Sequence, residues 1–329
     1  MLEDRIMIST IEKVIKTNSN YLEFLRKVFL PGLILFAFVP IVVGQKVPAG
    51  ELYIAKVFTP PNIFTSGIEG PAVDKNGNLY AVNFNQKGTV GMVNYKGEAS
   101  LFIKLPEGST GNGIRFNSRG NMLIADYVKH NILEVDMKSG KIRVLAHEPH
   151  MNQPNDIAID NKNRVYASDP NWKNGSGKIW RISDKGEVTL VRDSLGTTNG
   201  IELSPDDKIL YVNETVQKKI WAFDINPDGS LKNKRLFIEF SDFGMDGMRC
   251  DVKGNLYVTR YGKGSVVMLS PKGNLLKEIN LRGKNPSNIA FGGEDGCTVY
   301  VTLQDQGNIE SFRVPFAGRA FRMNNMERE

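Results

Sequence analysis

Six polar side chains recur at equivalent places in this chain, and they are the residues best suited to chemistry. Each stands directly before a short apolar segment; in order they are Glu69, Asn112, Asn155, Asn199, Asp246 and Ser287. Any one Asn or Asp at such a place is ordinary loop chemistry. That preference does not account for a glutamate at the first position, nor for an oxygen-bearing side chain at all six. Together these residues indicate a ring of oxygen donors.

A second set of residues stands at the end of the next segment along the chain in each repeat. These are Asn83, Asp126, Asp169, Glu214, Arg260 and Leu303. Antiparallel pairing would return the second set to the face where the first set begins. We therefore expect the carboxylates of both sets to gather at one mouth, with Arg260 as the one positive group. Several carboxylates held this close cannot all stay ionised unless something positive lies among them.

The donor types predict a bound calcium ion. Carboxylate and amide oxygens, with no His or thiolate among them, suit a hard cation, and Ca²⁺ accepts an irregular set more readily than Mg²⁺. The carboxylates of Glu69 and Asp246 alone would balance its two charges. We predict Glu69, Asn155, Asn199 and Asp246 as metal ligands, with another divalent cation as the alternative. Asn112 is a fifth candidate, through water or through a contact to the substrate.

The segments that must position these residues repeat at intervals of 41 to 47 residues. One unit runs from Gly70-Pro-Ala-Val-Asp through the turn Lys75-Asn-Gly-Asn to Leu79-Tyr-Ala-Val, and five similar units follow. A period of this length with several short strands per unit is typical of a propeller built of four-stranded blades. The sequence therefore predicts an all-β, six-bladed β-propeller, in which equivalent residues of successive blades converge on one axis.

The repeat sets the predicted domain boundaries. We expect one closed propeller over residues 62–316, a linker over 45–61 and a polar tail over 317–329. The sixth repeat supplies only three strands, which would leave unpaired backbone at the edge of the ring. Glu51–Phe58 alternates as a strand does, so we predict that it fills the gap and closes the ring.

The N-terminal part of the chain carries a different signal. Residues 1–27 are a polar leader, and residues 28–44 form an uncharged apolar run at the lower limit for a membrane-spanning helix. Arg26 and Lys27 precede that run, which favours a transmembrane anchor with the propeller outside the cytoplasm. A cleaved signal peptide ending near Gly44 is the alternative, and it would make the protein secreted.

Composition excludes several other classes of protein. The formal charge is +6, and no Lys/Arg block with interleaved aromatic residues occurs, so we expect no nucleic-acid partner. The only two cysteines, Cys250 and Cys297, have no metal-binding spacing, and a disulfide between neighbouring blades is the alternative to two free thiols. No Gly-x-Ser-x-Gly motif occurs, which disfavours a serine esterase.

Several separated motifs resemble one known family, in order along the chain. They are Ile68-Glu-Gly-Pro, Gln153-Pro-Asn-Asp, Tyr166-Ala-Ser-Asp-Pro, Thr198-Asn-Gly-Ile-Glu-Leu-Ser-Pro-Asp-Asp, Met245-Asp-Gly-Met-Arg-Cys-Asp and Pro286-Ser-Asn-Ile-Ala-Phe-Gly-Gly-Glu-Asp-Gly. Residues 62–316 closely resemble the regucalcin, gluconolactonase and luciferin-regenerating-enzyme family. The resemblance implies a six-bladed propeller with one divalent ion, usually calcium, at the mouth of its tunnel. It also implies hydrolysis of sugar lactones or related esters, and its metal ligands fall on the same four residues.

The resemblance also suggests roles for individual side chains. It gives the aspartate at position 246 a ligand and acid–base role, and Asp169 is a second candidate for accepting the proton of the attacking water. We expect four residues of the rim to hold the substrate: Trp172, Tyr261, Arg260 and Arg249.

Two other functions stay open at this point. The chain also resembles squid-type diisopropyl fluorophosphatase, so the same metal site could hydrolyse organophosphates. The third alternative is an exported propeller that is no enzyme, binds a partner through its loops and keeps only a structural calcium.

Overall fold

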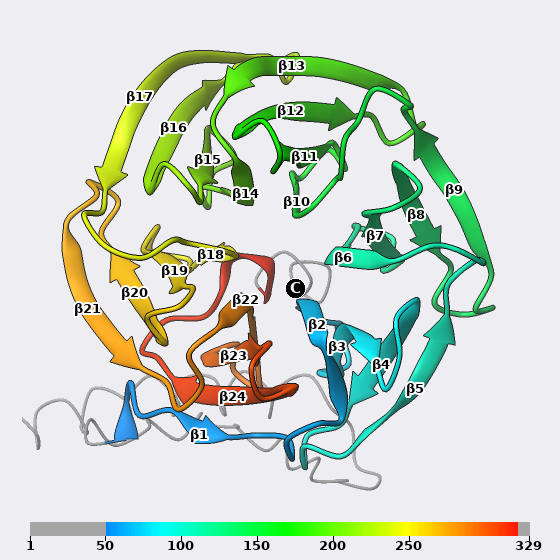
Figure 1. The fold of residues 1–329 in the computed structure, drawn as a ribbon, viewed down its shortest axis with the longest axis vertical. Coiled ribbons are helices and arrows are strands. Elements are labelled where there is room, and N and C mark those ends of the chain that lie inside the picture. Colours follow the sequence, from blue (N-terminus) through cyan, green and yellow to red (C-terminus); the bar gives the residue numbers. More distant parts are fainter. Residues whose placement is uncertain (1–50, 322–329) are drawn as a thin grey trace, which may run out of the picture. The chain divides into compact units, whose positions relative to one another are not determined.

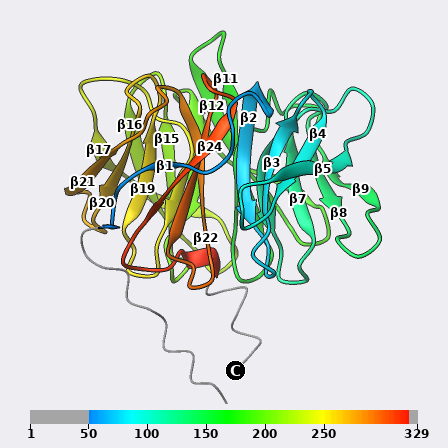
Figure 2. The ribbon, with the colours of Figure 1, turned by 90° about the horizontal axis from the view of Figure 1, so that it is seen from below.

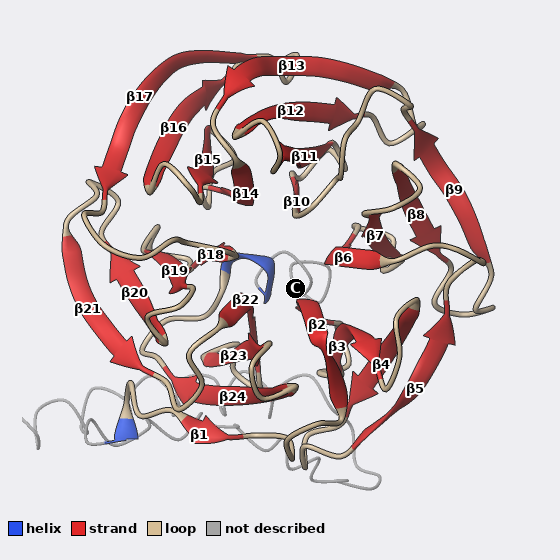
Figure 3. Ribbon diagram, in the orientation of Figure 1, coloured by secondary structure: helices blue, strands red, loops and turns tan. Residues whose placement is uncertain are grey.

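A computed structural model describes residues 51–321, which form six four-stranded antiparallel sheets set around a central axis (Figure 1). This confirms the predicted all-β, six-bladed propeller. Strands make up nearly all of the regular structure in the described range (Figure 3). The predicted apolar span 28–44 lies outside the described residues and stays a prediction. Within residues 51–321 no helix has the length and apolar character needed to cross a membrane.

The strands follow one another from the axis outwards in every blade but the last. The first three blades are β2 (Phe64–Val73), β3 (Leu79–Phe84), β4 (Thr89–Val93) and β5 (Ala99–Lys104); β6 (Gly111–Phe116), β7 (Met122–Asp126), β8 (Asn131–Val135) and β9 (Ile142–His147); β10 (Ile157–Ile159), β11 (Val165–Asn171), β12 (Ser176–Ile182) and β13 (Val188–Leu195). The other three are β14 (Thr198–Leu203), β15 (Ile209–Glu214), β16 (Lys219–Ile225) and β17 (Leu231–Glu239); β18 (Met248–Cys250), β19 (Leu256–Arg260), β20 (Ser265–Leu269) and β21 (Leu275–Asn280); β22 (Pro286–Gly292), β23 (Thr298–Leu303), β24 (Asn308–Arg313) and β1 (Lys56–Val57).

The hydrophobic core lies between neighbouring blades rather than at the axis. Leu123 and Ile132 of the second blade, for example, pack with Ile157 and Val165 of the third. Full burial of one such aliphatic side chain stabilises a fold by about 1.5–3 kcal/mol. The outermost strands, such as β17, are largely exposed, whereas the inner strands are buried. The channel at the axis can therefore be lined by polar groups without weakening the core.

The ring closes through the N-terminal strand, as the sequence predicts. Strand β1 pairs antiparallel with β24, with Lys56 opposite Ser311. The strand is shorter than the predicted Glu51–Phe58, because its N-terminal part contributes only an isolated bridge between Leu52 and Arg313. Strand β1 is therefore the fourth strand of the sixth blade.

The residues after β24 return beneath the ring (Figure 2). Gly318 forms an isolated bridge with Asp251, and the Arg319 side chain is buried, donating hydrogen bonds to the carbonyl oxygens of Ser204 and Ile159. The first residues of the predicted polar tail are therefore a packed part of the propeller. This differs from the expectation because the guanidinium finds two backbone acceptors and an aspartate there.

Neither cysteine is bonded. Cys250 is buried in β18, and Cys297 lies half-buried in the turn before β23; both are free thiols. The alternative of an inter-blade disulfide is therefore not realised in this structure.

The closure makes a prediction about stability. The buried Thr59 hydroxyl accepts a hydrogen bond from the backbone N–H of Ile309 at 2.9 Å. Thr59→Val should leave that buried N–H unsatisfied and lower the free energy of unfolding by about 1–3 kcal/mol in chemical denaturation. The matched control Thr189→Val removes an exposed threonine from β13 and should change it by less than about 0.5 kcal/mol. Equal effects of the two variants would contradict a structural role for the closure.

Candidate metal centre

The predicted ring residues occupy irregular points of the inner strands. In four blades the pairing register shifts at or beside the ring position; the shifts fall between Glu69 and Ala72, Gly111 and Ile114, Thr198 and Ile201, and Pro286 and Asn288. In the other two blades the inner strand begins only after the ring residue, at Ile157 and Met248. Such bulges bend a strand and redirect its side chains. Here these irregularities release the ring residues from regular hydrogen bonding between the paired strands.

Neighbouring blades approach each other closely at the residue directly after the ring residue. The backbone N–H of Gly113 donates to the carbonyl of Asn155, and that of Gly247 donates to the carbonyl of Ser287. A Cβ atom on Gly113 would lie 2.5 Å from the Asp156 Oδ1, closer than atoms can approach. Only glycine fits such a site. Bonds between blades thus draw the inner strands together, and the ring residues with them.

Five of the six ring residues line one cavity of about 490 Å³ at the mouth of the channel. They are Glu69, Asn112, Asn155, Asn199 and Asp246, and all five are buried. Ser287 is the exception, because its hydroxyl donates to the carbonyl of Ile68. The wall also includes three aromatic residues, Tyr127, Trp172 and Tyr261, and the basic residue Lys87.

The two acids of this cavity resist ionisation. Burial, opposed by a hydrogen bond from the Gly70 N–H and reinforced by the charge of Asp156, raises the pKa of Glu69 to about 7. Burial also raises the pKa of Asp246 well above its ordinary value, and the neighbouring Glu69 and Asp156 carboxylates add to the shift. Both acids line the same cavity, and the charge of Glu69 opposes the ionisation of Asp246.

Two amide oxygens in the same cavity are left without donors. The Asn199 side chain donates a hydrogen bond to Asp246. Its Oδ1 atom, like that of Asn112, is buried and has no hydrogen-bond partner among the described residues. Unsatisfied buried oxygens and carboxylates that repel each other are all stabilised by a cation. The residues present therefore fit a divalent ion. Within residues 51–321 no three His, Cys, Asp or Glu side chains gather in a group that could hold a metal ion, so such an ion would also need the amide oxygens.

The predicted gathering of a second set of carboxylates is wrong. Asp126, Asp169 and Glu214 do not line the cavity. Each accepts backbone N–H groups from the loop before the inner strand of its own blade: those of Thr110, of Asn152 and Gln153, and of Gly196. Antiparallel pairing does return these acids to the predicted end of the channel. Their carboxylates do not line the cavity, because they accept hydrogen bonds from loop N–H groups instead.

Asp169 shows this most fully. Its carboxylate accepts the N–H groups of Asn152 and Gln153 at 2.8 and 2.7 Å, and the indole N–H of Trp180 at 2.9 Å. It is fully buried and lies away from the cavity wall. Since its acceptor sites are occupied by the protein, Asp169 is placed to hold a loop and not to accept a proton from a substrate or water.

The predicted substrate contacts divide into two groups. Asn112, Trp172 and Tyr261 line the cavity. Arg260 does not, because its guanidinium lies 3.8 Å from the ring centroid of Phe240 and pairs with Asp242. Arg249 does not line the cavity either. It stands three residues after Asp246 along the chain and forms an ion pair with Asp156 at 3.3 Å.

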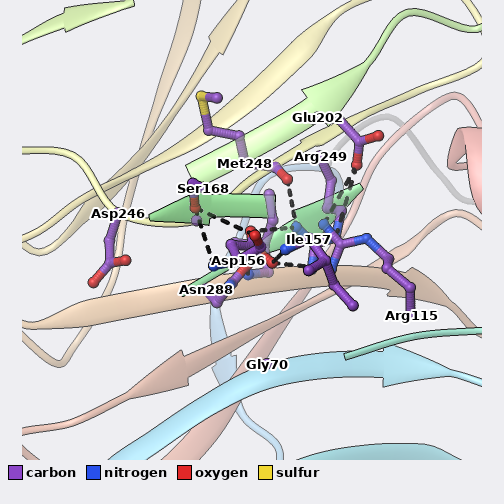
Figure 4. A network of polar contacts seen from close by, with 12 residues as sticks. Gly70, Arg115, Asp156, Ile157, Ser168, Glu202, Asp246, Met248, Arg249 and Asn288 are labelled. Atoms are coloured by element: carbon purple, nitrogen blue, oxygen red, sulfur yellow. Dashed lines mark hydrogen bonds and ion pairs between the residues drawn. The ribbon is translucent and has the colours of Figure 1, made fainter. Parts of the chain in front are cut away.

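The sequence reasoning missed the ionic network below the ring (Figure 4). Asp156 stands one position after the ring, where four of the other five blades have glycine. It pairs with Arg115 at 3.2 Å and with Arg249 at 3.3 Å. Burial opposes its ionisation, but the two guanidinium groups outweigh that and lower the pKa of Asp156. An aspartate at a position where four blades have glycine and the sixth has Asn288 was the signal that could have found it.

Fold and site together define a six-bladed propeller with an oxygen-donor centre at one mouth of its channel. The chain belongs to the SMP-30/Gluconolactonase/LRE-like family, which it matches over residues 67–305. It is 27% identical over 289 residues to the gluconolactonase of Zymomonas mobilis, covering 76% of this chain and 80% of that protein. It is 25% identical over 292 residues to the diisopropyl-fluorophosphatase of Loligo vulgaris, covering 79% and 92% respectively.

A solved structure supports the same fold. The calcium-binding protein regucalcin from Agrobacterium tumefaciens superimposes with a TM-score of 0.68 at 21% identity, covering 80% of this chain and 97% of that one. At this level of identity the similarity shows the shared fold.

The raised pKa values predict that the stability of the protein depends on pH when a chelator keeps metal ions away from the site. The pKa of Glu69 is about 7 in the folded chain and near its ordinary 4.5 when unfolded, so the folded state binds the proton more tightly. The free energy of unfolding should then fall as the pH rises from about 4.5 to about 7. Denaturation at pH 5 and pH 8 measures this fall. It should be much smaller in the Glu69→Gln, Asp246→Asn double variant, and an equal fall in both proteins would contradict the shared environment.

Proposed function

We propose that this protein is a divalent-metal-dependent hydrolase of lactones or related esters, with calcium as the metal. The observation that carries the proposal is the set of buried oxygens at the channel mouth. Two of them belong to carboxylates with raised pKa values, and two belong to amides without donors. Membership of the family supports it, as do relatives named gluconolactonase, 6-deoxy-6-sulfogluconolactonase and pentonolactonase.

Glu69, Asn155, Asn199 and Asp246 would hold the cation, with Asn112 beside them. A divalent ion there supplies Lewis-acid chemistry, which polarises a carbonyl and stabilises the oxyanion formed when water attacks. The Asp246 carboxylate would take the proton of the attacking water.

The rest of the cavity suits a small cyclic ester. Trp172 and Tyr261 offer flat apolar faces, and a volume of about 490 Å³ admits a sugar-sized ring. The Tyr261 hydroxyl donates a hydrogen bond to the Gln304 side chain at 3.1 Å, which holds the phenol ring of Tyr261 in place. Below the ring of donors, Arg115, Asp156 and Arg249 cross the channel. Substrate would therefore enter and product leave through the same mouth.

Hydrolysis of an organophosphate on the same centre is the second candidate. It is favoured by the similarity to the diisopropyl-fluorophosphatase of Loligo vulgaris, which extends over 92% of that protein. Both reactions use a polarised oxygen and an attacking water, so only a substrate comparison separates them. If the protein binds metal but hydrolyses no lactone of a broad panel, that result would favour the role of a binding protein.

We expect the full chain to hydrolyse δ-gluconolactone faster than a phosphotriester, and to lose that activity in a chelator and regain it with Ca²⁺. Asp246→Asn should lower kcat/KM at least about 100-fold, since it removes both a metal ligand and the base. The matched control Asp242→Asn removes the same charge four residues away, outside the cavity, and should retain activity. Unchanged metal content and rate in Asp246→Asn would overturn the assignment.

A further inference from the structure

The cavity that holds the oxygen donors has one basic residue in its wall, Lys87. This lysine lies in the turn between β3 and β4 of the first blade, the same blade that supplies Glu69 from β2. It is exposed, and it has no hydrogen bond or ion pair to any residue of the described range 51–321. Its ammonium group is therefore available to a ligand that enters the cavity.

The turn that carries Lys87 is held in place by hydrogen bonds. The buried Thr89 hydroxyl lies 2.7 Å from the carbonyl oxygen of Phe84 and 2.8 Å from that of Gln86, so it closes the turn. The carbonyl oxygen of Gly88 accepts a hydrogen bond at 2.8 Å from the backbone N–H that follows β5. The backbone on both sides of Lys87 is therefore fixed at the cavity wall.

The order of strands in the blade sets how far Lys87 lies from the predicted metal ligands. Neighbouring strands are about 4.8 Å apart, and the turn between β3 and β4 lies one to two strands outward from β2. Gly67 on β2 and Asn83 at the end of β3 also line the cavity on this side, and neither brings a charge. The lysine is thus placed to meet a substrate several bonds away from a carbonyl held at the ring of donors.

The charges of the cavity wall favour a substrate with a negative group. Of the residues that line the cavity, only Glu69, Asp246 and Lys87 are of charged types. A divalent cation would balance the two carboxylates, and the acids beneath the ring are already paired with arginines. The positive charge of Lys87 is then left over, so the field in the cavity attracts an anionic group.

We propose that this site prefers lactones that carry a carboxylate or a similar anionic group several bonds from the lactone carbonyl, and that the Lys87 ammonium group pairs with that anionic group. Lys87 would thus determine specificity and take no part in the chemical step. The inference rests on the lactone hydrolase activity proposed above and adds to it the charge of the substrate.

Two lactones that differ in one group test this preference. D-glucaro-1,4-lactone has a carboxylate where D-glucono-1,4-lactone has a hydroxymethyl group, so the ratio of their kcat/KM values in the Ca²⁺-loaded full chain isolates the charge. The ratio should favour the charged lactone by about three- to fivefold at low salt, the size of an exposed ion pair, mainly through a lower KM. The preference should shrink in about 0.5 M salt, because salt screens exposed charges.

Variants of Lys87 separate its charge from its shape. Lys87→Met should bring the ratio to about one, Lys87→Arg should keep it, and Lys87→Glu should reverse it in favour of the neutral lactone. The matched control Lys129→Met removes the same charge from the turn between β7 and β8 of the next blade, outside the cavity. It should change the ratio by less than about twofold.

The outcomes distinguish this inference from the proposed function. If neither 1,4-lactone is turned over, their dissociation constants from calorimetric titration replace kcat/KM in the same comparison. Equal values for the two lactones, or an unchanged preference in folded Lys87→Glu, would overturn the inference and leave the hydrolase function standing. A chain that binds these lactones with the expected preference but hydrolyses no lactone would overturn only the proposed function. A chain that binds and hydrolyses none would overturn both.

Discussion

The constraint on which the site depends is the crowding of two acids at the axis of the propeller. Glu69 and Asp246 come from the first and fifth blades, and the inner strands bring them together because inter-blade bonds after the ring leave room only for glycine at Gly113 and Gly247. Burial, the dominant cause, makes the two carboxyl groups resist ionisation. The fold thus holds two acids whose charges oppose each other, and the cation proposed above would relieve that repulsion.

The channel is organised in layers along the inner strands. The first layer carries carboxylate and amide oxygens, the next carries Asp156, and the third carries Arg115, Arg249 and Glu202. Asp156 separates the layers electrically: its charge raises the pKa of both acids above it and is itself balanced by the arginines below. A buried ion network of this kind gives little net stability but fixes where each side chain lies. It also separates two cavities, one lined by the oxygen donors and the other by the two arginines.

Much of this arrangement could be predicted from the sequence, because a repeat turns spacing along the chain into position around an axis. The six blades, the closing strand and the polar ring all followed from that register. Register gives the end of the channel at which a residue lies, but not the direction of its side chain. Asp169 was expected at the mouth and turns instead to loop amides that no periodicity reveals. Arg249 was expected at the rim, but it stands three residues after Asp246 along the chain and lines the other cavity.

The central claim is that oxygens from four blades enclose one divalent cation. Anomalous diffraction from crystals grown with Ca²⁺ tests it most directly. The account predicts one strong peak at the channel mouth, with side-chain oxygens of Glu69, Asn155, Asn199 and Asp246 at about 2.3–2.6 Å from it. A structure with calcium in solution and no peak there, or with Glu69 and Asp246 turned away from the peak, would contradict the account.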